Sequence, residues 1–174
     1  SEMPEQSEGL MRGFQLWVNL PARLKMSEPG YQEHGSQRMP IEDRANGVRV
    51  KVIAGETSSG TRGPVTAETT QPIYFDIELP ADGEFVEPVR SDRAAFIVAH
   101  EGRIAVGDKT LEAVGLAELG TGDTVRLRAA DGPARALLIA GKPINEPVVW
   151  HGPFVMNTQE ELLQAIDDYQ AGRF

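Results

Sequence analysis

The chain of 174 residues contains no cysteine, which excludes disulfides, thiolate nucleophiles and cysteine-ligated zinc or iron–sulfur centres. This absence is typical of reducing compartments, and we expect a cytoplasmic protein. No apolar run approaches the ~20 residues that span a bilayer, and no basic-then-apolar leader is present, so a membrane is not an expected partner. Positive charge is also scarce, because 17 Lys and Arg stand against 26 Asp and Glu, giving a net charge of −9. An acidic surface repels phosphate backbones, so direct nucleic-acid binding is not expected.

Short apolar segments of strand length fill most of the sequence between 18 glycines and 12 prolines. Within 48–54 and 73–79, apolar and polar residues alternate with a period of two, as in strands with one buried face. The predicted strands are 12–20, 48–54, 73–79, 94–99, 103–106, 116–119, 124–127 and 135–139. Short strands separated by turns every 8–12 residues or so predict an all-β antiparallel sandwich or barrel.

One segment near the C-terminus has the pattern of a helix. Thr158 and Glu161 form a capping box, in which each side chain satisfies the other residue's backbone donor. Leu162, Ile166 and Tyr169 then recur on one face. The sequence therefore predicts a single helix that closes the chain.

The segment 21–46 is polar, contains several glycines and prolines, and has no sustained periodicity. It is predicted to be a linker with one short turn at 21–25. The strand 12–20 then lies on the far side of this linker from the other strands. Since one strand cannot form a core alone, we expect 12–20 to pair outside the main barrel.

The three histidines, His34, His100 and His151, are too far apart in sequence for the usual metal-ligand spacing of two to five residues. His34 lies in the predicted linker and is expected to be solvated. His100 ends an apolar strand and is expected to line a barrel end or cap a hairpin. His151 is expected to pack rather than to catalyse. The sequence leaves open whether the three meet in space.

No nucleophile-elbow or phosphate-binding motif is present. The segment 55–60 (GETSSG) is rich in glycine and hydroxyl groups, but it lacks the lysine that a phosphate-binding loop requires. We interpret it as a flexible loop. Because acidic residues are numerous, close pairs arise by chance, and none is assigned as a general acid or base.

Five sequence segments closely resemble the pirin family and occur in the family's order: 11–21, 52–55, 63–65, 146–149 and 152–158. Pirins are bicupins, with two β-barrels of the cupin type facing each other. The resemblance implies an all-β fold, a jelly-roll-like antiparallel cupin barrel with one C-terminal α-helix. It also implies the domain boundaries, which are 1–20 as the last strand of an N-terminal barrel, 21–46 as a linker, 47–145 as the C-terminal barrel and 146–174 as an extension with the helix.

The resemblance also indicates where a metal would bind. Pirins hold an iron-type divalent metal in the N-terminal barrel through a His-x-His pair and a later His-Ser-Glu. Ser1 and Glu2 resemble the end of that last motif, so Glu2 matches the carboxylate ligand. Its three histidine partners have no counterpart here, and Glu2 alone is not expected to bind metal. We therefore expect a chain from which the first barrel is missing, by truncation, by proteolysis or because it is part of a longer protein.

The second barrel is not expected to hold a metal either. A cupin takes its ligands from His-x-His, a nearby Glu and a later His. The corresponding first three positions here are Pro88, Arg90 and Ala95, and no histidine lies between His100 and His151. None of these side chains is a ligand for a divalent transition metal. The sequence predicts no catalytic residue, no cofactor-binding residue and no bound cofactor for this chain alone.

For an intact pirin, the resemblance implies a quercetin 2,3-dioxygenase type activity at the metal, transcription-factor co-regulation by direct contact, or both. We expect this chain alone to be catalytically inactive. The alternative is a free-standing single-domain cupin that binds a small molecule in its barrel mouth, lined by Tyr74, Arg90, His100 and Glu101.

We also expect a homodimer through the apolar strand 12–20, because an unpaired apolar strand recruits other chains. The competing possibility is that residues 1–20 fold back on their own barrel or remain disordered.

Overall fold

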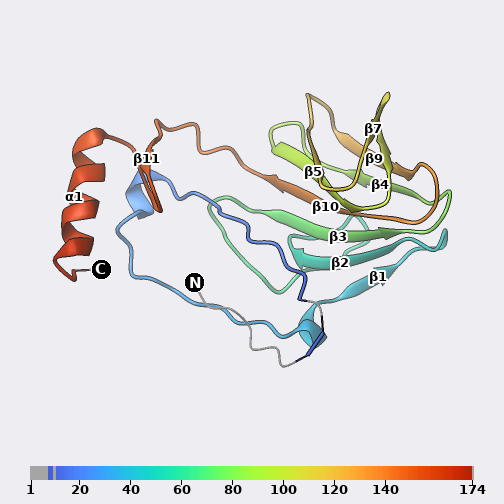
Figure 1. The fold of residues 1–174 in the computed structure, drawn as a ribbon, viewed down its shortest axis with the longest axis horizontal. Coiled ribbons are helices and arrows are strands. Elements are labelled where there is room, and N and C mark those ends of the chain that lie inside the picture. Colours follow the sequence, from blue (N-terminus) through green and yellow to red (C-terminus); the bar gives the residue numbers. More distant parts are fainter. Residues whose placement is uncertain (1–7, 10, 174) are drawn as a thin grey trace. The chain divides into compact units, whose positions relative to one another are not determined.

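The structure, a computed structural model, describes residues 8–9 and 11–173 (Figure 1). The chain forms two compact units. The larger is Met26–Asn145, and the smaller combines the two ends of the chain, Ser1–Lys25 and Glu146–Phe174. None of the described helices is long and apolar enough to cross a membrane.

The larger unit contains two antiparallel sheets, labelled in Figure 1. The six-stranded sheet has the order β1-β2-β3-β10-β5-β8, and the four-stranded sheet has the order β4-β9-β6-β7. Their bounds are β1 Ile41–Asp43, β2 Arg49–Ala54, β3 Ile73–Leu79, β4 Glu84–Pro88, β5 Ala94–Glu101, β6 Ile104–Val106, β7 Lys109–Leu111, β8 Gly115–Glu118, β9 Thr124–Ala129 and β10 Ala134–Gly141. A short 3₁₀ helix, Ser36–Arg38, precedes β1. The predicted all-β antiparallel fold is confirmed.

The core of this unit follows from the period-two pattern of the strands. In β3, Phe75 and Ile77 have no exposed surface, whereas Asp76 between them is half-buried. The same alternation in β9 places Leu127 inside. In β10, Leu138 joins the core, while its neighbour Leu137 is also buried but lies outside the core cluster. A central strand covered on both faces explains why 135–139 reads as a continuous apolar run.

Two predictions about the N-terminal region were wrong. Residues 11–20 form no strand, because a ladder needs a partner strand and no described segment supplies one. Within the predicted linker 21–46, residues 41–43 form β1, which pairs with β2. The domain boundaries themselves remain a prediction.

The smaller unit contains a hairpin of β11 (Val149–His151) and β12 (Phe154–Met156), a 3₁₀ helix at Ala22–Leu24 and the helix α1 (Gln159–Gln170). The predicted capping box is confirmed, since Thr158 accepts from the Glu161 backbone and the Glu161 carboxylate accepts from the Thr158 backbone. The buried face of α1 carries Leu162 and Ala165. The predicted face was partly wrong, because Tyr169 is 64% exposed.

Hydrogen bonds over long sequence distances join the two chain ends into this unit. Lys25 Nζ donates to Asn19 Oδ1 and to the Val155 carbonyl, each at 2.7 Å. The Glu146 carboxylate accepts from the Ala22 backbone at 2.7 Å. Burial lowers the pKa of Lys25, although Glu146 opposes this shift. The short turn predicted at 21–25 is therefore the point at which the N-terminal segment is attached to the C-terminal hairpin.

Candidate functional site

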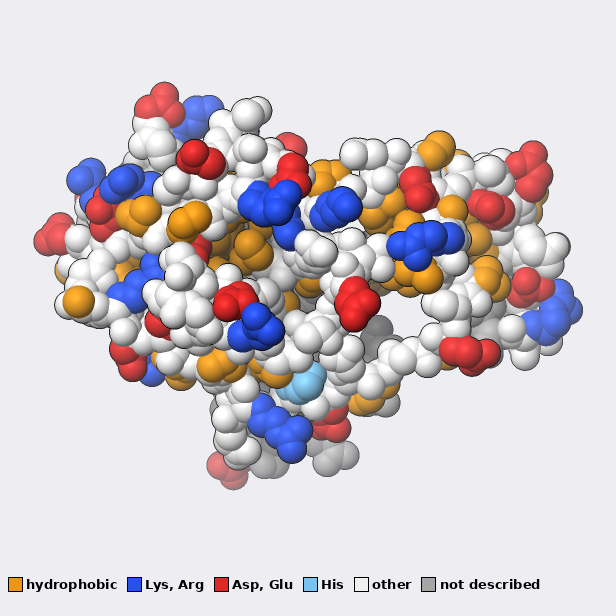
Figure 2. All heavy atoms as spheres, turned by 180° about the vertical axis from the view of Figure 1, so that it is seen from behind, with side chains coloured by type: hydrophobic (Ala, Val, Ile, Leu, Met, Phe, Trp, Pro, Cys, Tyr) orange, Lys and Arg blue, Asp and Glu red, His pale blue; other side chains and the backbone are white. Residues whose placement is uncertain are grey.

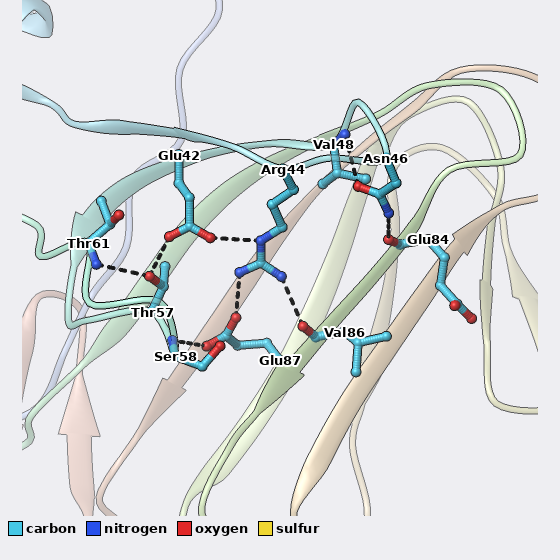
Figure 3. Close-up of polar contacts among 10 residues, drawn as sticks. All are labelled: Glu42, Arg44, Asn46, Val48, Thr57, Ser58, Thr61, Glu84, Val86 and Glu87. Atoms are coloured by element: carbon cyan, nitrogen blue, oxygen red, sulfur yellow. Dashed lines mark hydrogen bonds and ion pairs between the residues drawn. The ribbon is translucent and has the colours of Figure 1, made fainter.

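A polar cluster is centred on Arg44, directly after β1 (Figure 3). Arg44 Nε donates to Glu42 Oε1 at 2.8 Å, and its Nη2 donates to Glu87 Oε2 at 2.5 Å. Its Nη1 donates to the Val86 carbonyl at 2.9 Å. The guanidinium carbon also lies 4.7 Å from the centre of the Phe85 ring, a cation–π contact. Arg44 therefore joins β1 of one sheet to β4 of the other.

The position of Glu87 is unusual for a charged residue. It shares the inward face of β4 with Phe85, and only 2% of its surface is exposed. A buried carboxylate is tolerated only when it is paired and hydrogen-bonded. Arg44 supplies the charge, and the Ser58 backbone donates to Glu87 Oε1 at 2.5 Å.

The loop 55–62 is fixed by the same two carboxylates. Thr57 Oγ1 donates to Glu42 Oε2 at 2.5 Å and accepts from the Thr61 backbone at 3.1 Å. Thr57 is itself only 4% exposed. The prediction of a flexible loop at 55–60 was therefore wrong, because its hydroxyl groups and backbone bind the acidic cluster.

The cluster is built to hold charge rather than to transfer protons. Burial by itself raises the pKa of Glu42, but interactions with Thr57, Thr61 and Arg44 outweigh it and lower that pKa below its ordinary value. All four carboxylate oxygens of Glu42 and Glu87 accept a hydrogen bond. We call Glu42, Arg44, Thr57, Ser58 and Glu87 the inter-sheet clamp. Glu87 could have been suspected from the sequence, since it interrupts an alternating apolar pattern at an inward position.

The three histidines lie in different environments. His34 Nε2 lies 3.4 Å from Gln32 Oε1 in the segment before β1. His100 lies on the face of β5 away from the core, with its Nε2 3.3 Å from Asp76 Oδ1, so it does not line the barrel interior. His151 is on β11 in the smaller unit and is exposed rather than packed.

The described residues do not fit a divalent iron site. Across 8–9 and 11–173, no three or more His, Asp or Glu side chains are grouped so as to hold a metal ion. The two carboxylates that do converge, Glu42 and Glu87, are bound to Arg44. Glu2, the predicted carboxylate position, lies outside the described residues.

Two cavities of the larger unit are formed by described residues, and the predicted pocket residues do not meet in either. The larger cavity, about 640 Å³, is bordered by Arg90 but not by Tyr74, His100 or Glu101. The smaller, about 400 Å³, is bordered by Glu101 alone of the four. Tyr74 lies on β3 beside Asp76, where burial and that carboxylate raise its pKa. The four residues predicted to line one barrel mouth therefore do not border either of these two cavities together.

Comparison with known proteins agrees with the fold. Residues 74–174 match the family described as the pirin C-terminal cupin domain. A pirin-like protein of Caulobacter vibrioides is 57% identical over the whole chain, and human pirin is 40% identical over 98% of it. The crystal structure of quercetin 2,3-dioxygenase from Acinetobacter baumannii is 33% identical and aligns with a TM-score of 0.83 over 91% of this chain.

The relatives are longer than this chain. It spans 63% of the Caulobacter protein, 59% of human pirin and 55% of the Acinetobacter chain. The match lies in the C-terminal part of the curated relatives. The larger unit is thus the expected cupin-type β-barrel, and the helix α1 follows it. The chain belongs to the pirin family and corresponds to the C-terminal part of its members.

Proposed function

We propose that this chain serves as the C-terminal, metal-free cupin domain of a pirin-type protein and has no quercetin 2,3-dioxygenase activity by itself. The proposal rests on the side chains that could serve as metal ligands. Tight transition-metal sites need three or four converging ligands, and the described residues offer no such group. In the longer family members, an iron-type divalent metal in the N-terminal barrel would supply the oxygen chemistry.

The role of this domain is then structural. The inter-sheet clamp joins the two sheets through Arg44, and the loop 55–62 is fixed to the same carboxylates. Such a barrel offers a rigid surface to a neighbouring domain or protein. Transcription-factor co-regulation and a cytoplasmic location remain predictions that fit this role.

The test is an activity assay on the purified 174-residue chain. The chain is incubated with ferrous iron and quercetin in air, and the loss of quercetin absorbance is compared with that of iron alone. The Acinetobacter baumannii quercetin 2,3-dioxygenase provides the positive control. We expect no turnover above that of iron alone. Turnover together with stoichiometric bound iron would show that the argument from the metal ligands is wrong.

We also propose that the chain forms a homodimer through residues 12–20. In this segment Trp17, Val18 and Leu20 are 63%, 50% and 43% exposed, and the described residues 11–20 belong to no helix or strand. Figure 2 shows apolar side chains lying between charged ones on the smaller unit. Pairing of this segment with its copy would provide backbone hydrogen bonds and cover apolar surface at the same time.

Light scattering tests the dimer at micromolar concentration. We expect the wild-type chain to have twice the monomer mass and the variant Trp17→Ser to be a monomer. Leu163→Ser is the matched control, because Leu163 is also more than half exposed but lies on α1. A wild-type monomer would contradict the proposal, as would equal dissociation of both variants.

A further inference from the structure

The larger cavity opens at one end of the barrel, between the edge strands of the two sheets. Its walls come from the β6–β7 hairpin, from β8 and from the connection that leads into β9. Its floor is the top of the hydrophobic core, since Val89, Ala95 and Val125 are core residues that are 5–8% exposed. A volume of about 640 Å³ lies within the range of sites for small organic ligands.

Two basic residues, Lys109 and Arg93, border this cavity. Lys109, an exposed residue of β7, pairs across the hairpin with Val106 and borders the cavity. Arg93 lies in the bend directly before β5, is partly buried and also borders the cavity. Two cationic side chains therefore border the cavity beside its apolar floor.

The acidic residues that border the cavity do not neutralise these cations. Glu118 is an exposed residue of β8 and lies opposite Phe96, on the face of the sheet away from the core. Asp108 belongs to the exposed hairpin turn. Arg93 donates to the backbone and side-chain oxygens of Gln71, a neutral partner, and its charge also helps to lower the pKa of Asp92, after the larger effect of Arg90.

The remaining cations on the rim are already paired. Arg90 Nη2 lies 2.7 Å from Asp92 Oδ2, and Arg126 Nη1 lies 2.8 Å from Glu84 Oε1. Lys109, by contrast, has no carboxylate within ion-pair distance among the described residues. A chain with a net charge of −9 thus keeps at this cavity a lysine with no carboxylate partner among the described residues, together with the guanidinium of Arg93.

We propose that this cavity binds a small organic anion with a flat apolar body, of the aromatic carboxylate class. The apolar body would cover Val89, Ala95 and Val125, and the carboxylate would accept hydrogen bonds from Lys109 and Arg93. This inference does not depend on the metal chemistry of the family. It concerns a site in the C-terminal barrel itself.

The test is an NMR titration of the ¹⁵N-labelled 174-residue chain with naphthalene-2-carboxylate, and separately with the neutral naphthalene-2-carboxamide. We expect saturable shifts of the backbone amides of 106–111 and 117–125 with the carboxylate. The carboxamide should bind about tenfold more weakly, because it loses the charge-assisted bonds. Equal binding of the two probes would overturn the proposal, as would shifts confined to 11–20, the exposed apolar segment.

Three variants identify the cation. Lys109→Glu should weaken carboxylate binding at least about tenfold, whereas Lys109→Arg should retain it. Lys142→Glu makes the same charge change at an exposed residue that does not border the cavity, and it should bind like the wild type. Unfolding curves confirm that each variant is folded. Undiminished binding by a folded Lys109→Glu chain, or equal weakening by Lys142→Glu, would show that the cavity is not the site.

Discussion

The inter-sheet clamp gives a direct test of how this barrel is held together, through the substitution Arg44→Met. Methionine keeps much of the side-chain length but removes the charge and three hydrogen bonds. The carboxylate of Glu87, which is 2% exposed, would keep only the bond from the Ser58 backbone. An uncompensated buried charge is therefore the main cost.

Removing one partner of a buried ion pair costs about 3–5 kcal/mol. The side chain of Arg44 is 17% exposed, so some water reaches the pair, and we expect a loss near the lower end, about 3 kcal/mol of unfolding free energy. This is a large share of the ~5–15 kcal/mol that stabilises an ordinary domain. Arg49→Met is the matched control. The side chain of Arg49 is 50% exposed beside Asp43 and Glu78, and its loss should cost less than about 1 kcal/mol.

Urea unfolding at pH 7, followed by far-UV circular dichroism, measures these differences. Tryptophan fluorescence is recorded alongside it, because Trp17 and Trp150 both belong to the smaller unit and report on that unit instead. The double variant Arg44→Met with Glu87→Met should be more stable than Arg44→Met alone, since it also removes the stranded charge. A single-variant loss below about 1 kcal/mol, or a double variant that shows the plain sum of both losses, would refute the reasoning.

Three further predictions concern single residues. The pKa of Glu42 in the folded state lies below its ordinary value of 4.5. Its contribution to the unfolding free energy is therefore present above pH 4.5 and is lost as the pH falls through the folded-state pKa. Thr57→Val should weaken this acid dependence in unfolding curves measured between about pH 3 and pH 6. Gly102→Ala should lower the unfolding free energy by about 2 kcal/mol, because φ is +68° and a Cβ atom would collide with the carbonyl oxygen of Pro133; unchanged urea unfolding would contradict this. Thr158→Ala should cost about 1 kcal/mol and speed hydrogen exchange in the first turn of α1, whereas equal exchange rates would show that the cap contributes little.

Local alternation explains which parts of the fold were predictable. The strand 73–79 was predicted with its observed bounds, because each apolar residue alternates with a polar one and turns flank both ends. The helix was predictable from its capping box for the same reason, since both partners lie within four residues. In contrast, β4 escaped prediction because Glu84, Glu87 and Pro88 interrupt its apolar pattern.

The candidate sites depended on contacts that no local pattern contains. Arg44 and Glu87 are 43 positions apart, and only the packing of β1 near β4 brings them together. The same limit applied to the pocket residues. Tyr74 and His100 are expected from the sequence to line a barrel mouth, but their strands turn these side chains away from the core. Because successive residues of a strand face opposite sides, a shift of one residue along the strand moves a side chain from the interior to the outside of a sheet.

The missing metal ligands and the cationic cavity can be understood as one feature of the second barrel. Two of the three positions at which the family resemblance places cupin ligands, Arg90 and Ala95, border the larger cavity. A guanidinium and a methyl group cannot coordinate a divalent metal, because neither offers a lone pair at neutral pH. The same cavity is lined by Lys109 and Arg93 above an apolar floor, a set of groups that repels a cation and attracts an anion. If the proposed carboxylate binds there, this cavity has the chemistry of an anion site instead of that of a metal centre. A single substitution that restores only one histidine should therefore neither create a metal site nor remove the anion site.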